Sequence, residues 1–241
     1  PDPSGYYKVT YIYKNGPADK DYIKIKPGDL LLAIDGQELK TSDNYWRFYN
    51  TTPGRKFELT VNSKPSLDDA WKATVEPISS GAHSTLLYEK WVAERKAIVE
   101  KLSGGEIGYL HIRAMNAESL RKFERDLVEN HFKKALIIDQ RFNGGGGIEQ
   151  ELLQILQQRR FQYRQGRDSG VEISRPQRAF FGPMVVMQNE MSGSNAEMFP
   201  DGFRRLGLGK VIGVPTLGGV IGTGSYRLMD GSQLRTPAFG V

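Results

Sequence analysis

Along its first eighty residues, the chain alternates between apolar and polar positions at the two-residue period that is typical of strands. The alternating segments are residues 6–13, 56–63 and 71–78. The apolar run Leu30–Ile34 predicts a further strand, because turn residues bound it on both sides. Tyr45, Trp46 and Tyr49 are spaced as on a short helix. Together these segments predict a β-rich unit over residues 1–79, which is long enough for a small domain.

A stretch of small and polar residues at 78–84 separates this unit from a segment with a helical period. The apolar positions there recur at spacings of four and seven residues: Leu87, Trp91, Ile98 and Leu102. We therefore expect a linker helix over residues 80–104 with one apolar face, ended by Gly104 and Gly105.

From residue 105 onward, short apolar runs alternate with amphipathic segments. The apolar runs are "EIGYLHI", "ALIID", "PMVVMQN" and "KVIGV". The helical segments include "GIEQELLQILQQ" and a stretch that continues through Phe203. Buried strands that alternate with helices predict a layered α/β core with a largely parallel sheet. We assign this core to residues 105–241 and expect it to be incomplete at its C-terminal end.

Composition narrows the possible functions. The 241 residues include no cysteine, which excludes thiol nucleophiles, disulfides and thiolate metal sites. No stretch reaches the ~18–20 apolar residues that span a bilayer. The net charge is a mild +5, and the one basic cluster, "RRFQYRQGR" at residues 159–167, interleaves arginines with aromatics. Such a cluster can bind nucleic acid, but we favour a solvated loop and expect no nucleic-acid partner.

A glycine-rich turn interrupts the string "IIDQRFNGGGGIEQ", residues 137–150, between a strand and a helix. Glycines allow close backbone approach, and the first amides of a helix lack intrahelical partners. The string lacks the lysine of a phosphate-binding P-loop and the spacing of a dinucleotide fingerprint. It fits an oxyanion hole, and it fits a simple tight turn equally well.

Residues 188–199, "QNEMSGSNAEMF", repeat this strand–turn–helix pattern with Ser192 and Ser194 on either side of one glycine. A serine at the start of a helix is most often only an N-cap. Pro200 follows inside the predicted helix and cannot donate a hydrogen bond to the carbonyl of Ala196. We therefore expect a bend in that helix.

Four strings in this order resemble the tail-specific, or C-terminal-processing, serine peptidases of family S41, and in particular their tricorn-like subgroup. They are "GYLHI", "LIIDQRFNGGG", "NEMSGSNAEMF" and "GLGKVIGVPTLGGVIGTG". The preceding string "GYYKVTYIYKNGPADKDYIKIKPGDLLLAIDG" resembles a PDZ domain. The resemblance implies a PDZ-like domain followed by a ClpP/crotonase-like layered α/β core. It further implies a peptide or unfolded-protein substrate, a homo-oligomer, and no metal or organic cofactor.

The family motif also assigns roles to residues. Its second serine is the nucleophile, which maps to Ser194 and leaves Ser192 as a supporting residue of the turn. By the same resemblance, the backbone amides of Gly146 and Asn195 form the oxyanion hole. Both amides belong to turns that lead into helices, where N–H groups lack intrahelical partners, so the local chemistry agrees.

The sequence departs from the family at the catalytic base. Serine–lysine members carry their lysine in the motif "TFGKG", whereas this chain has "TLGG" with Gly219 at the lysine position. His83, His111 and His131 are adjacent to no carboxylate or second ligand in sequence, and we assign each a structural or surface role. Tricorn-like enzymes take a serine–histidine pair from before the PDZ domain and a glutamate from the far end of the core. We therefore expect a base from outside residues 1–241 and an inactive isolated segment.

The sequence also departs from the family at two features that bear on substrate specificity. The tricorn archetype lines its pocket with an acidic residue for basic substrate side chains, whereas the matching segment here is basic and contains Arg164. An arginine would favour acidic side chains or a free carboxylate. The loop "PSGYY" lacks the Gly-hydrophobic-Gly-hydrophobic pattern of PDZ domains. Capture of a peptide C-terminus and a role as a spacer or gate both stay open for this domain.

Two other functions are also compatible with the sequence. One is a non-catalytic peptide-binding module in which Ser194 is only an N-cap. The other is acyl-CoA chemistry, because related layered folds also use paired amides as an oxyanion hole. The serine between Gly193 and Asn195 disfavours the second, since that chemistry needs no nucleophile there. The compartment stays unknown, and we favour the cytoplasm over an extracytoplasmic location.

Overall fold

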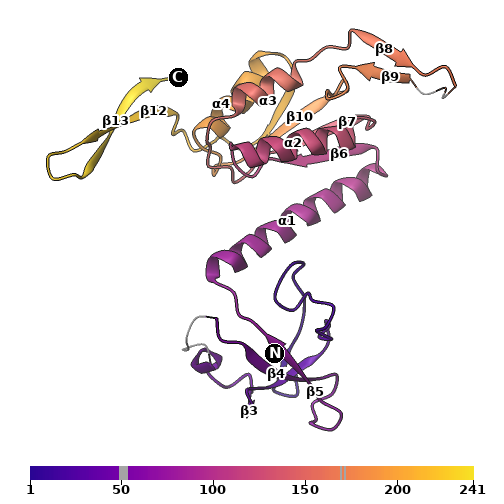
Figure 1. Cartoon of the computed structure of the whole chain (residues 1–241), viewed down its shortest axis with the longest axis vertical. Coiled ribbons are helices and arrows are strands. Elements are labelled where there is room, and N and C mark those ends of the chain that lie inside the picture. Colours follow the sequence, from indigo (N-terminus) through magenta and orange to yellow (C-terminus); the bar gives the residue numbers. More distant parts are fainter. Residues whose placement is uncertain (49–53, 169, 171) are drawn as a thin grey trace. The chain divides into compact units, whose positions relative to one another are not determined.

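The computed structural model describes residues 1–48, 54–168, 170 and 172–241, so the predicted helical position Tyr49 lies outside the described residues. The chain divides into two units, residues 1–94 and 95–241, which Figure 1 colours along the sequence. The division falls inside α1 (Ser80–Ser103), the helix that the apolar spacing predicts. Every residue of α1 is described and none of its side chains is buried, with Leu102 82% exposed.

The first unit is built on an antiparallel sheet with the strand order β1-β2-β4-β5. Its strands are β1 (Tyr7–Lys8), β2 (Leu30–Ile34), β4 (Phe57–Asn62) and β5 (Trp71–Val75), with β3 (Gln37–Glu38) paired to β2. A 3-10 helix, η1 (Tyr45–Phe48), occupies the predicted helical position. The buried cluster of this unit consists of Ile34, Leu39, Phe48 and Phe57.

The strand predicted over residues 6–13 is much shorter in the structure. Within this fully described stretch, Tyr7 and Lys8 alone pair with β2. The alternating aromatics further along serve ring packing instead, because Tyr11 stacks edge-on against Tyr13 and Tyr13 against His83, with centroids 5.0 Å and 5.7 Å apart. Aromatic alternation therefore mimicked a strand period here.

The second unit contains the predicted parallel sheet, with the order β11-β10-β7-β6 and parallel pairing throughout. Its strands are β6 (Ile107–His111), β7 (Ala135–Asp139), β10 (Met184–Gln188) and β11 (Gly209–Gly213). The helices between them are α2 (Ala117–Asn130), α3 (Glu149–Leu156) and α4 (Asn195–Arg205). Helices α3 and α4 lie side by side (Figure 1). The expected mixed α/β fold is confirmed.

The sequence pattern did not predict two hairpins of this unit. They are β8 (Gln162–Gln165) with β9 (Glu172–Arg175), and β12 (Ile221–Arg227) with β13 (Gln233–Gly240). Every residue of β8 is exposed, as are most residues of β13. A strand without a buried face shows no apolar alternation, so the signal that finds other strands is missing.

The parallel register brings the carboxyl ends of β7 and β10 to the same edge of the sheet, with Met187 opposite Asp139. The glycine-rich segment follows β7 and the two serines follow β10. In open α/β sheets this edge is where ligands bind.

Candidate active site

Two turns meet at the carboxyl edge of the sheet. We call residues 143–147 the glycine turn and residues 189–194 the serine turn. A Cβ on Gly145 would lie 2.8 Å from the Cβ of Ser194 and 3.1 Å from the amide nitrogen of Asn195. Gly145 also has a φ of 100°, where glycine is favoured. The turns are therefore in direct contact, and this contact requires glycine at position 145.

The two serines of the serine turn differ sharply in exposure. Ser192 is fully buried, and its hydroxyl donates to the carbonyl of Gln140 at 3.3 Å and accepts from the Asn189 amide at 3.3 Å. Ser194 is exposed and lines a pocket of about 460 Å³. Its backbone has φ 54° and ψ −123°, a conformation that is strained for any residue with a side chain. Ser192 thus holds the turn, while Ser194 is the serine that a ligand can reach.

Asn143 connects the two turns to the sheet. Its buried side chain donates to the carbonyl of Ile112 at 3.0 Å and accepts from the amide of Gly145 at 2.9 Å. Its own carbonyl accepts from the amide of Gly193 at 3.0 Å. One residue therefore sets the shape of the glycine turn and its distance from the serine turn.

The two amides expected to form an oxyanion hole both border the pocket. Gly146 and Asn195 line it together with Ser194. Within the described part of the chain, neither amide has a hydrogen-bond partner, whereas the neighbouring Gly147 amide donates to Met115 at 2.7 Å. Unpaired N–H groups beside a nucleophile can bind developing negative charge.

The side chain of Asn195 couples the serine turn to α3. Its Oδ1 accepts from the amides of Ile148 at 3.0 Å and Glu149 at 3.2 Å, and its Nδ2 donates to the Glu149 carboxylate. Asn195 therefore caps the helix that follows the glycine turn. Its side chain therefore ties the start of α3 to the end of the serine turn.

Gln140 compensates for the proline inside α4. Pro200 has no amide hydrogen to give to the carbonyl of Ala196. The side chain of Gln140 donates to that carbonyl instead, at 2.6 Å in a buried setting. The residue that follows β7 thereby anchors the helix that begins after Ser194.

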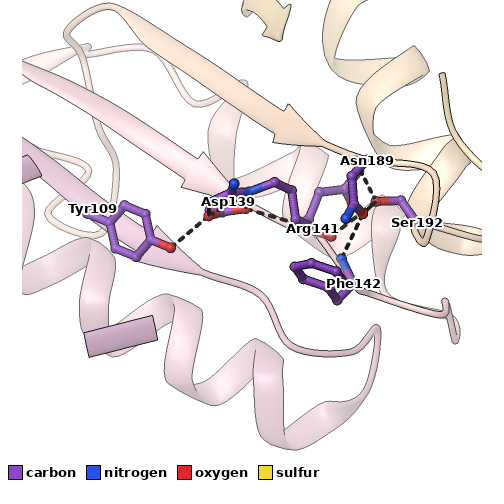
Figure 2. Close-up of polar contacts among 7 residues, drawn as sticks. Tyr109, Asp139, Arg141, Phe142, Asn189 and Ser192 are labelled. Carbon is purple, nitrogen blue, oxygen red and sulfur yellow. Dashed lines mark hydrogen bonds and ion pairs between the residues drawn. The ribbon is translucent and has the colours of Figure 1, made fainter. Parts of the chain in front are cut away.

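A hydrogen-bonded cluster of ionisable side chains lies at the end of β7, just before the glycine turn. Figure 2 shows the Tyr109 hydroxyl donating to Asp139 at 2.7 Å and the Arg141 guanidinium paired with the same carboxylate at 2.6 Å. Burial alone would raise the pKa of Asp139, but the hydrogen bonds from Arg141 and Tyr109 outweigh it and hold that pKa below its ordinary value. Burial, together with the Asp139 charge, raises the pKa of Tyr109.

The residue after Arg141, Phe142, is also held in place (Figure 2). Its backbone adopts a positive φ of 65°, and its amide donates to the Asn189 side chain at 2.9 Å. The strained backbone is thus fixed by a residue of the serine turn.

The described residues that line the pocket include no histidine, lysine or arginine, so none of them is a candidate base of the expected kind. Burial lowers the pKa of His111 to about 4, more than the Asp139 charge raises it, so His111 is a neutral residue of the sheet. His83 is exposed on α1 and His131 lies at the end of α2.

The pocket lining also locates the predicted specificity residue. Arg164 lies on the exposed strand β8 and is not among the described residues that line the pocket beside Ser194. Two acidic residues of α3, Glu149 and Glu151, line it instead, as does Phe239 of the second hairpin. Among the described residues, acidic and apolar groups rather than basic ones surround the approach to Ser194.

Three supporting residues were missed at the level of sequence: Gln140, Asn143 and Glu197. Two of the bonds concerned, Thr216–Glu197 and Gln140–Ala196, span 19 and 56 residues of sequence. One signal was present, since Pro200 leaves the Ala196 carbonyl without a helical donor and so requires a donor from elsewhere.

The fold and the pocket define a layered α/β protein with an exposed serine at the carboxyl edge of a parallel sheet. The sequence model of Peptidase family S41 matches residues 106–241. The chain belongs to this family. In the described part of the chain, no helix has the length and apolar character needed to cross a membrane.

Several relatives are similar over most of the chain. Tricorn protease homolog 1 of Streptomyces coelicolor is 34% identical over 218 residues, which are 90% of this chain and 20% of that protein. Tricorn protease of Thermoplasma volcanium is 38% identical over 213 residues, which are 88% of this chain and 20% of that protein. The chain thus spans about a fifth of the length of these relatives.

A solved structure is similar as well. The crystal structure of the tricorn protease superposes with a TM-score of 0.81 at 28% identity, covering 96% of this chain and 23% of that one.

Proposed function

We propose that this chain carries the nucleophile and oxyanion hole of a tricorn-like serine endopeptidase. Ser194 attacks the carbonyl carbon of a peptide bond, and the amides of Gly146 and Asn195 bind the resulting oxyanion. A histidine from outside residues 1–241 removes the proton from the Ser194 hydroxyl.

One observation carries this proposal. An exposed serine with a strained backbone shares a pocket with two unpaired backbone amides of the described chain, one from the glycine turn and one from Asn195, the residue that directly follows the serine turn. A serine that served only as an N-cap would need neither the strain nor the second turn.

Because the base is expected outside residues 1–241, the segment and the whole protein should differ in peptidase activity. A serine hydroxyl without a base is a poor nucleophile, and losing one member of a catalytic triad costs about 10⁴–10⁶ in turnover. Residues 1–241 alone should therefore cleave peptides barely or not at all. The whole protein should cleave an unfolded protein substrate.

The test compares the whole protein with its Ser194→Ala and Ser232→Ala variants on a fluorescently labelled unfolded protein. Ser232 lies in the exposed turn between β12 and β13 and serves as the control. We expect cleavage to survive Ser232→Ala and to be lost in Ser194→Ala. Cleavage that persists in Ser194→Ala would overturn the assignment.

Substrate choice and assembly are part of the same proposal. Arg164 would favour acidic side chains or a free carboxylate, so a peptide panel that shows preference for basic residues before the scissile bond would contradict that role.

We propose that residues 1–79 form a PDZ-like domain and that the whole protein acts as a homo-oligomer on peptides.

A further inference from the structure

The carboxylate of Glu197 is surrounded by four hydrogen-bond donors. Its Oε1 accepts from the amides of Ser194 at 2.8 Å and Gly219 at 2.9 Å. Its Oε2 accepts from the amide of Gly218 at 2.6 Å and the hydroxyl of Thr216 at 2.7 Å. Each oxygen thus accepts two bonds.

Only an ionised carboxylate satisfies this set of donors. Three of the four are backbone amides, which donate and cannot accept. A glutamine would place its own NH₂ group against at least one of those amides. Burial would raise the pKa of Glu197, but the bonds from Thr216, Gly218, Gly219 and Ser194 outweigh it and hold the pKa below its ordinary value.

These bonds join the serine turn to a segment that follows β11. The segment comprises residues 216–219, and it makes a further bond from the Leu217 amide to the Ser192 carbonyl at 2.9 Å. The next three residues, Val220–Gly222, line the pocket beside Ser194. Glu197 therefore contacts both the strained backbone of Ser194 and the segment that leads into one side of the pocket.

We propose that Glu197 is a positioning residue for the reaction. Its anion holds the Ser194 amide, and with it the nucleophile, and the same anion fixes residues 216–219 so that Val220–Gly222 stay at the substrate. The inference rests on the proposed function of Ser194. It assigns Glu197 no contact with the reacting atoms.

The test uses the whole protein and an alkyl fluorophosphonate that labels activated serines, with kinact and KI measured separately. Glu197→Gln should lower kinact by about 10–100-fold, because backbone donors lose their acceptor. It should also raise KI, because the pocket segment is released. Glu129→Gln, on an exposed residue of α2 outside the pocket, is the matched control and should behave as wild type.

A second pair of variants covers the case in which Glu197→Gln does not fold. Thr216→Val removes one donor, and Thr216→Ser keeps it. We expect Thr216→Val to raise KI by about 3–10-fold and Thr216→Ser to match wild type. Equal values for the two Thr216 variants, or wild-type kinact and KI in folded Glu197→Gln, would overturn the inference.

Failure of the proposed function gives a different result. In that case the wild-type whole protein itself would not be labelled at Ser194, and the inference would fall with it. A role in stability alone would lower the melting temperature of Glu197→Gln while leaving kinact and KI of the folded fraction unchanged, which also contradicts positioning.

Discussion

The side chain of Gln140 donates a hydrogen bond to the backbone carbonyl of Ala196 at 2.6 Å, across 56 residues of sequence. This carbonyl needs an outside donor because Pro200 occupies the position that would otherwise supply the helical amide. The bond anchors α4, whose first turn follows Ser194, to the end of β7. Gln140 and Pro200, which come from separate segments of the sequence, are thus structurally coupled.

Replacing Gln140 should therefore destabilise the second unit. Gln140→Leu leaves the buried Ala196 carbonyl unpaired, which costs about 1–3 kcal/mol. Denaturant unfolding measures the loss, and Gln154→Leu, on an exposed residue of α3, provides the control. Pro200→Ala supplies a helical amide, so it should reduce the cost of Gln140→Leu in a double-mutant cycle. Additive effects of the two substitutions would refute the coupling.

The Asn195–Glu149 contact gives a second prediction. Asn195→Asp keeps an acceptor for the amides of Ile148 and Glu149 but places a carboxylate against the Glu149 carboxylate. We expect a loss of about 1–2 kcal/mol at neutral pH from this repulsion. Glu149→Gln should restore most of the stability in the Asn195→Asp background, as judged by the melting temperature. An unchanged or lower melting temperature in the double variant would contradict the contact.

The contact between the glycine turn and the serine turn gives a third prediction. A Cβ on Gly145 would meet the Gly193 carbonyl at 2.7 Å and the Ser194 Cβ at 2.8 Å. Gly145→Ala must therefore separate the turns, and labelling of Ser194 in the whole protein should fall by at least about tenfold, by analogy with the loss of one oxyanion donor. Gly144→Ala is the matched control, because no described atom outside residues 143–145 lies within 4 Å of its Cβ position. Equal labelling of the two variants would speak against the close contact.

The buried histidine predicts a pH dependence of stability. An unfolded histidine binds a proton below about pH 6.5, whereas folded His111 stays neutral until its pKa of about 4. Between these values the unfolded state binds more protons, so the free energy of unfolding should fall by ~1.4 kcal/mol per unit as the pH is lowered.

Denaturant unfolding at several pH values measures this slope. His111→Gln should flatten it in the window from about pH 6.5 to about 4. If the His111→Gln profile has the wild-type slope, then His111 is not the group responsible.

The sequence was most informative where apolar runs are buried on both faces. The strands β6, β7 and β10 follow from such runs, and the turns after β7 and β10 follow from glycine and serine chemistry. Strand β11 also follows from an apolar run, although none of its residues is buried. The choice between Ser192 and Ser194 did not follow from spacing, because both flank the same glycine. Burial separates them in the structure, and the resemblance to family S41 had favoured the same serine.

Other features depend on contacts that no local pattern encodes. Glu197 looks like an ordinary helix-start residue in sequence, yet its other three donors come from residues 216–219. The two hairpins have exposed faces and so carry no alternation. Long-range partners and exposed strands are therefore what the sequence alone left unpredicted.

The most direct test of the central claim is to locate the adduct of an alkyl fluorophosphonate on the whole protein by peptide mass spectrometry. We expect one modified residue, Ser194, with labelling abolished in Ser194→Ala and retained in Ser232→Ala. A whole protein that is folded and active on peptides but carries no adduct at Ser194 would contradict it.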